Sequence, residues 1–128
     1  MIHLKSYSGQ QDAKFYIQCK GNHSGRPLKD PIPNSFAVYT DVPNAFEIIY
    51  GLYKSRTFQT RIIGSVVPFI RKRDLMEILE PAFKKSYDPK KLEAIALIDK
   101  QIENELKRIE LLKKMQRALA IQVLKESK

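Results

Sequence analysis

The residue types that most often carry catalysis or bind metals are scarce in this chain. It contains one cysteine, Cys19, and two histidines, His3 and His23. A structural zinc site needs four ligands, and a nucleophilic cysteine needs a base placed to take its proton. We therefore expect no metal site, no cofactor and no catalytic residue, and we interpret Cys19 as a small buried side chain.

Two short motifs suggest other chemistry. Residues 105–107 read Glu-Leu-Lys, the Glu-x-Lys form of some metal-dependent nucleases, and residues 21–25 are glycine-containing, as phosphate-binding loops are. The first motif lies in a long predicted helix, whereas carboxylates that gather Mg²⁺ usually converge from a sheet. The second is followed by Arg-Pro instead of Lys-Ser/Thr and a helix. We therefore rank a nuclease below a DNA-binding protein and a protein-interaction module. We interpret residues 21–25 as a turn.

A run of cationic residues gives the strongest binding signal. No acidic residue occurs between positions 54 and 73, and hydroxyl and amide side chains are interleaved with the cations. Arginine suits bidentate contacts to phosphate or guanine, and a Gly-Ser turn lets backbone N–H groups approach a phosphate. The alternative is the solvated face of a helix. We expect a DNA-binding surface, with Arg56 and Arg61 exposed and reaching the duplex, formed by Lys54, Arg56, Arg61, Ser65, Arg71, Lys72 and Arg73.

The charge balance also favours an anionic partner. The 128 residues carry 23 Lys and Arg against 14 Asp and Glu, a net charge of +9. Such a surplus favours nucleic acid or an anionic membrane, although simple solubility explains it as well. The lone cysteine and the lack of a secretory signal predict a cytoplasmic protein. No apolar run reaches the about 18 residues that a membrane span needs.

Strands are predicted in the first forty residues. Residues 13–20 and 35–40 are rich in aromatic and β-branched side chains, and the turn at 21–25 follows the first of them. Three prolines between positions 27 and 33 predict an extended loop between the two strands.

A helix is predicted to follow these strands. Thr40 or Asp41 can cap it, and Pro43 suits its first turn. Apolar residues at helical spacing in 46–53 form a stripe that would pack on the strands. We expect Gly-Ser at 64–65 to interrupt this helix.

The remaining elements complete an α+β fold. Residues 66–70 are interpreted as a short buried strand or extended segment, and residues 74–79 as a short helix that ends before Pro81. The predicted architecture is a small mixed α/β domain, residues 1–88, followed by a long C-terminal coiled-coil-like helix, residues 89–128.

The C-terminal segment is the most regular part of the sequence. From Pro89 onwards it has no glycine and no further proline, and its apolar residues recur about every 3.4 positions, the period of a coiled-coil seam. A helix of this length is about 57 Å long, so we expect its partner to be another chain. The predicted homodimer interface consists of Ile95, Ile98, Ile102, Leu106, Ile109, Leu112, Met115 and Leu119.

Some apolar residues of this helix lie off the seam. They are Leu97, Leu111, Ile121 and Leu124, and they allow the helix to pack on its own domain and on a partner together. The sequence alone fits parallel and antiparallel pairing equally well.

Three segments resemble the specificity subunits of type I restriction-modification systems. Residues 49–59 (Ile-Tyr-Gly-Leu-Tyr-Lys-Ser-Arg-Thr-Phe-Gln) and 64–75 (Gly-Ser-Val-Val-Pro-Phe-Ile-Arg-Lys-Arg-Asp-Leu) look like the end of a target recognition domain, and residues 92–102 are similar to the start of the spacer helix. The resemblance implies a half-size protein with a DNA-reading domain on a helix that pairs with a second helix and is held by methyltransferase subunits. Residues 24–28 and 31–36 also resemble a small bacterial family of unknown function.

These observations lead to one function and one alternative. We expect a non-enzymatic, specificity-subunit-like protein that binds double-stranded DNA and forms a homodimer through its C-terminal helix. The alternative is a protein-interaction module that binds restriction-modification subunits or another coiled coil without reading DNA.

Overall fold

The computed structural model describes residues 1–127 and has the α+β class predicted from the sequence. The chain divides into two compact units. The first, Met1–Glu93, is called the head below, and the second begins at Ala94. The long helix α3 (Pro89–Glu126) starts at the end of the head and makes up the second unit.

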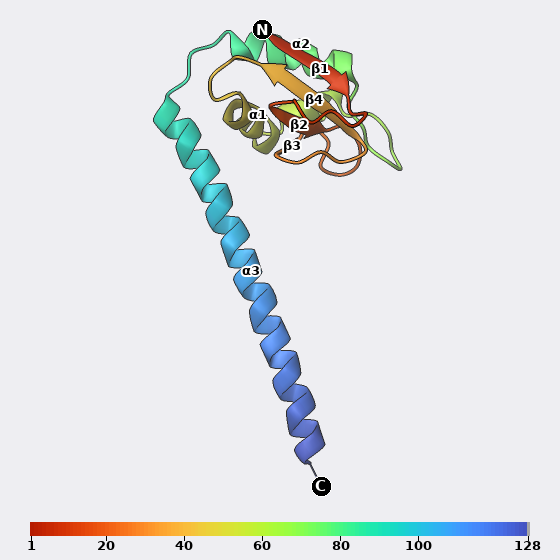
Figure 1. The fold of residues 1–128 in the computed structure, drawn as a ribbon, viewed down its shortest axis with the longest axis vertical. Coiled ribbons are helices and arrows are strands. Elements are labelled where there is room, and N and C mark those ends of the chain that lie inside the picture. Colours follow the sequence, from red (N-terminus) through yellow and green to blue (C-terminus); the bar gives the residue numbers. More distant parts are fainter. Residues whose placement is uncertain (128) are drawn as a thin grey trace. The chain divides into compact units, whose positions relative to one another are not determined.

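A four-stranded antiparallel sheet forms the centre of the head (Figure 1). Its strands are β1 (Ile2–Ser6), β2 (Phe15–Gln18), β3 (Pro27–Leu28) and β4 (Ser35–Thr40), in the order β1-β4-β2-β3. Strand β4 has the predicted bounds, and β2 lies within the predicted segment. The expected extended loop contains the short edge strand β3, which pairs with β2.

One face of the sheet is apolar because side chains alternate along each strand. Val38 of β4 is in register with Leu4 of β1 on one side and Phe15 of β2 on the other, and all three are buried. The helices α1 (Ala45–Lys54) and α2 (Lys72–Phe83) and the 3₁₀ helix η1 (Thr57–Arg61) add their buried side chains to the same core. The core of the head is therefore closed within one chain.

The predicted turn after β2 is confirmed, and it packs against η1. Gly25 has a φ of +94°, and a Cβ atom there would lie 2.5 Å from Cδ2 of Phe58, a side chain that is 1% exposed. Glycine is required at this position by both the backbone conformation and the close approach. This contact ties the β2–β3 connection to the core.

The predicted start of the first helix is wrong. Thr40 is the last residue of β4, and its hydroxyl donates to the carbonyl of Met1 and accepts from the N–H of Val42. Helix α1 begins at Ala45, after Asn44 in the left-handed conformation. The Thr40 hydroxyl is therefore used at the strand end, and residues 41–44 form the connection before α1.

The predicted end of that helix is also wrong. Helix α1 stops at Lys54, because Arg56 adopts a left-handed conformation with a φ of +65°, and η1 follows. The start of the expected buried strand or extended segment, residues 66–70, is an exposed loop that is closed by backbone hydrogen bonds between Ile63 and Phe69. Val66 at the tip of this loop is 90% exposed. The end of the segment fits the expectation, because Ile70 is buried and its N–H donates to the carbonyl of Cys19.

Helix α2 is longer than predicted and includes Pro81 in its last turn. Proline at this position removes one intrahelical hydrogen bond, a loss that packing has to offset. Leu79 and Ala82, on either side of Pro81, are buried in the head and hold this turn in place.

Helix α3 begins at the proline that the sequence indicated. Pro89 occupies the first turn, where its missing N–H is not needed, and the Asp88 carboxylate accepts a hydrogen bond from the N–H of Lys90 at 3.0 Å. The helix has 38 residues. No helix among the described residues is both long and apolar enough to cross a membrane.

Candidate interaction surfaces

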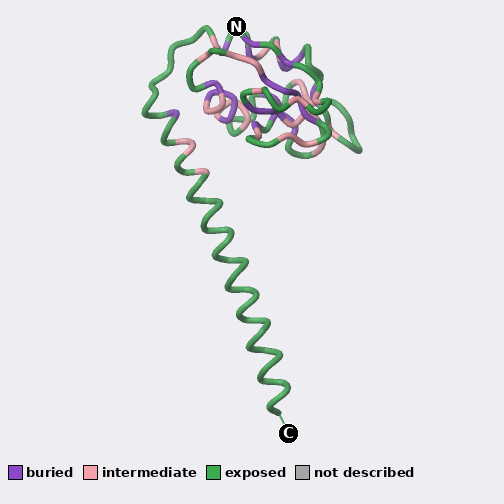
Figure 2. The backbone as a smooth tube through the Cα atoms, in the orientation of Figure 1, coloured by how far each residue is buried: buried purple, intermediate pink, exposed green. Residues whose placement is uncertain are grey.

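An apolar stripe runs along α3. Leu92 is buried and Ile95 is partly buried, but from Leu97 onwards every large apolar side chain of α3 is between 44 and 76% exposed. Figure 2 shows the exposed colour along almost the whole helix. Seven of the eight predicted dimer residues lie on this exposed part of the stripe: Ile98, Ile102, Leu106, Ile109, Leu112, Met115 and Leu119.

The four apolar residues off the seam are exposed as well. Leu97, Leu111, Ile121 and Leu124 are all at least 44% exposed. Apart from a few alanines, the rest of the helix surface is charged or amide-bearing, with pairs one turn apart such as Glu103 with Lys107 at 3.8 Å. Such pairs support an isolated helix only weakly. Most helical stability in proteins comes from packing an apolar face, so the stripe is the part of α3 that gains most from a partner.

The predicted DNA-binding residues are spread over α1, η1, the start of α2 and the segments that connect them. Lys54 ends α1, Arg56 precedes η1, and Arg61 ends η1. Ser65 lies in the exposed loop before α2. Arg71, Lys72 and Arg73 form the start of α2. The fold therefore brings part of the run together around the N-terminus of α2.

At this helix start, three of the arginines are held by two carboxylates. Nη1 of Arg61 donates to Oδ1 of Asp74 at 2.9 Å and to Oε2 of Glu77 at 2.6 Å. Nε of Arg71 donates to Oδ2 of Asp74 at 2.7 Å, and Nε of Arg73 donates to Oε1 of Glu77 at 3.3 Å. We call these five residues the arginine network.

The arginine network changes the acidity of its members. Hydrogen bonds from Arg71 and Arg61 lower the pKa of Asp74, although burial of this side chain opposes them. Hydrogen bonds from Arg61 and Arg73 lower the pKa of Glu77, and the bonds to Glu77 and Asp74 raise the pKa of Arg61. The arginines thus favour the ionised form of both carboxylates, and Asp74 also lies in the first turn of α2, where negative charge is favourable.

The expectation of an exposed Arg61 is wrong. Its side chain is 38% exposed, and the same guanidinium nitrogen contacts both carboxylates. For Arg71 and Arg73, by contrast, the sequence carries a signal of pairing, since Asp74 and Glu77 stand three and four residues after them on one helix.

Other cations of the run remain available to a ligand. Arg56 is exposed, as predicted, and so is Lys72; within residues 1–127 neither forms an ion pair. Lys54 is exposed and lies over the ring of Tyr50, 5.7 Å from its centroid. The arginine network and Lys72 together contain four cations and two carboxylates, so this end of α2 keeps a positive charge.

The residues with catalytic potential are not assembled with one another. Burial raises the pKa of the Cys19 thiol, which makes the reactive thiolate less available. Nδ1 of His23 lies 3.0 Å from the hydroxyl of Tyr53, and His3 lies on β1. Among residues 1–127 there is no group of three His, Cys, Asp or Glu side chains placed to hold a metal ion.

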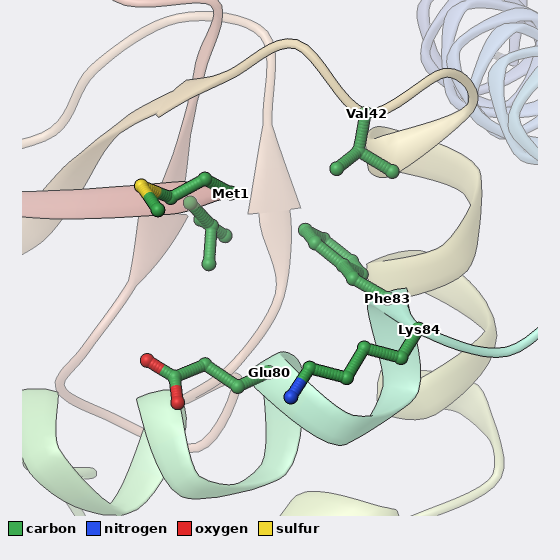
Figure 3. A pocket seen from close by; sticks show the side chains of 6 residues that line it. Met1, Val42, Glu80, Phe83 and Lys84 are labelled. Atoms are coloured by element: carbon green, nitrogen blue, oxygen red, sulfur yellow. The ribbon is translucent and has the colours of Figure 1, made fainter.

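The head also has one open, largely apolar hollow of about 390 Å³ (Figure 3). Met1, Ile2, Val42 and Phe83 line it, and the charged side chains of Glu80 and Lys84 stand on the α2 side. It offers apolar contact area but brings no nucleophile and base together. We therefore assign it no role in the function proposed below.

Comparison with known proteins gives one match. The model described as Family of unknown function (DUF6943) matches residues 3–122. The match covers nearly all of the head and most of α3. No curated protein and no solved structure matches the chain.

Proposed function

The chain belongs to this family of unknown function, and we propose that it is a self-associating binding protein in which α3 pairs with α3 of a second copy. The observation that carries the proposal is the exposed apolar stripe on a helix of 38 residues. Each large apolar side chain left in water forgoes about 1.5 kcal/mol or more of burial energy. A second copy offers a stripe of matching length and spacing.

The second candidate function is DNA binding by the head. It is supported by Arg56 and Lys72, which form no ion pair within the described residues, by exposed Lys54, and by the net charge of +9. The arginine network weakens this candidate, because half of the six cations in the predicted surface already contact carboxylates. Self-association is therefore the primary proposal, and DNA binding by the head is the second candidate.

A different occupant of the stripe is the main rival. The resemblance to restriction-modification specificity subunits favours methyltransferase subunits or another coiled coil as the partner. The two possibilities can be distinguished with pure protein. A self-associating chain forms dimers when it is pure, whereas a chain whose partner is a different protein stays monomeric.

The primary proposal is tested by changing the stripe. Ile102→Asp with Ile109→Asp places two charges per chain on the seam and should give monomers at micromolar concentration in light scattering. Lys100→Glu with Lys114→Glu changes the charge on the opposite face and should leave the dimer intact. Unaltered protein that is monomeric when pure and binds a heterologous subunit would favour the rival.

The DNA candidate is tested by salt dependence. Removing Arg56 and Lys72 together should shallow the slope of log affinity against log salt by about 1.8, because each neutralised phosphate contributes about 0.9. The matched control removes Lys5 and Lys14, two exposed cations at β1 and next to β2. Equal slopes for the two double variants, or no duplex binding at low salt, would eliminate DNA binding by this surface.

A further inference from the structure

Helix α3 carries a heptad pattern with two polar interruptions. In a coiled coil, the first and fourth residues of each heptad, positions a and d, face the partner helix. With Ile95 at position a, every a residue is β-branched except one glutamine. The d residues as far as Leu119 are isoleucine or leucine except one glutamate. The a positions are Ile95, Ile102, Ile109, Gln116 and Val123, and the d positions are Ile98, Glu105, Leu112 and Leu119. A polar residue at such a position is costly unless it meets a polar partner.

We infer that two copies of α3 pair antiparallel in a single register, an inference that rests on the self-association proposed above. The two-fold axis of this pair lies between Glu110 and Leu111. In an antiparallel pair, each a residue lies opposite a d residue of the other helix. This register places Glu105 opposite Gln116 of the second copy, twice in the dimer. The amide of a glutamine can donate to a carboxylate, so each interruption satisfies the other.

All neighbouring layers are apolar in this register. Ile98 lies opposite Val123, Ile102 opposite Leu119, and Ile109 opposite Leu112, and each of these side chains is exposed in the single chain. Beyond the last apolar layer, Ile95 lies opposite Glu126 at either end, where the carboxylate can reach water.

A shift of one heptad in either direction loses this match. One shift places Glu105 opposite Ile109 and Gln116 opposite Ile98. The other places Glu105 opposite Val123 and Gln116 opposite Leu112. Each alternative leaves four polar groups per dimer against apolar side chains, which disfavours it.

Parallel pairing is disfavoured by charge. It would place two copies of Glu105 in one layer and would bring Arg108 beside Lys113 of the other helix, so like charges meet at both places. In the antiparallel register the flanking residues are Leu106 beside Lys113, and Met115 beside Arg108. The aliphatic stems of these cations can cover the apolar side chains while their charges reach water.

Disulfide trapping tests the register. In a Cys19→Ala background, Ile102→Cys and Leu119→Cys are made as separate proteins with different tags. Under mild oxidation the mixture should give the crosslinked heterodimer, and neither protein alone should give a crosslinked homodimer. Homodimer crosslinks of both single variants would overturn the inference, because in a parallel pair each position meets itself.

Label distances provide a second readout on exposed positions. A spin label at Lys100 should lie about 32 Å along the axis from its copy in the antiparallel register, at 1.5 Å per residue, whereas in a parallel pair the two labels lie at the same height and only the width of the two helices separates them. A label at Glu110, beside the two-fold axis, should be close to its copy in both cases and is the control. A short distance at both positions would contradict the antiparallel arrangement.

The polar layer itself gives a third test. Gln116→Lys introduces an ammonium opposite Glu105 and should tighten the dimer by about fivefold, since it adds two ion pairs per dimer. Gln116→Glu should loosen it by a similar factor. A tighter dimer for Gln116→Glu than for Gln116→Lys would overturn the register.

The two proposals fail in different ways. A Cys19→Ala protein that is monomeric contradicts both self-association and the antiparallel register, whereas a dimer with parallel crosslinks contradicts only the register.

Discussion

The head and α3 place their apolar side chains in opposite environments. In the head, Ile17, Ile49 and Leu75 are 0% exposed, and the sheet and the helices share one core. In α3, Ile102, Leu112 and Leu119 are 49 to 60% exposed although they follow an equally regular pattern. A pattern of apolar residues thus predicts burial, but it does not say whether the covering surface comes from the same chain.

This difference has a thermodynamic consequence. Folding of the head depends on contacts within one chain, so its stability should not change with protein concentration. The pairing proposed for α3 needs a second molecule, so its stability should rise with concentration by mass action. Substitutions can therefore separate the two regions.

The largest expected effect comes from two adjacent leucines of α3. Leu112→Ala removes one seam side chain from each helix, a loss of about 3–6 kcal/mol per dimer and hence at least a 100-fold rise in the dissociation constant. Leu111→Ala removes an equally large side chain off the seam and should change the constant by less than about threefold. Sedimentation velocity over a concentration series measures both, and similar effects of the two variants would contradict the assigned seam.

The next effect belongs to the head. Phe58→Ala empties a site in the core that is 1% exposed, so it should lower the free energy of unfolding of the head by about 3–5 kcal/mol. The dimer dissociation constant, measured below the unfolding transition, should stay within about twofold. A large change in association would mean that the two regions do not act separately.

A smaller effect is expected from the arginine network in acid. The pKa of Asp74 is lowered in the folded head, so its contribution to stability is complete above the unfolded pKa of about 4 and is lost as pH falls through the folded pKa. Asp74→Asn should therefore destabilise the head at neutral pH and flatten the loss of stability below about pH 4. Denaturant unfolding at several pH values checks this, and an unchanged pH profile would show that the carboxylate is not held by the arginines.

The smallest effect should come from exposed apolar residues of the head. Val66 is 90% exposed at a loop tip, so Val66→Ser should change stability by less than about 0.5 kcal/mol and leave the dimer intact. Reduced self-association in this variant would place the loop in the interface, and the contrast between the head and α3 would need revision.

The sequence predicted best those elements that depend on local periodicity. Strand β4 and helix α3 combine a clear repeat with clear ends, such as Pro89 after Asp88. The start of α1 was wrong because Thr40 suits a helix cap and a strand end equally well, and only pairing with β1 decides between them. Pro81 predicts a helix end, but tertiary packing of Leu79 and Ala82 keeps the helix intact around it.

The candidate surfaces show the same limit. The stripe on α3 could be predicted, because exposure of the seam follows from the length of the helix and the small size of the domain before it. The pairing of Arg61 with Asp74 and Glu77 could not, since η1 and α2 are brought together only by the fold. Charge counted along the sequence therefore overestimated the free cationic surface.

The molecular mass of the pure protein in solution tests the central proposal most directly. Sedimentation equilibrium of residues 1–128, at concentrations from below one micromolar to about one hundred micromolar, should give twice the chain mass at the upper end and a reversible fall towards one chain mass on dilution. A single chain mass throughout this range would contradict self-association through α3.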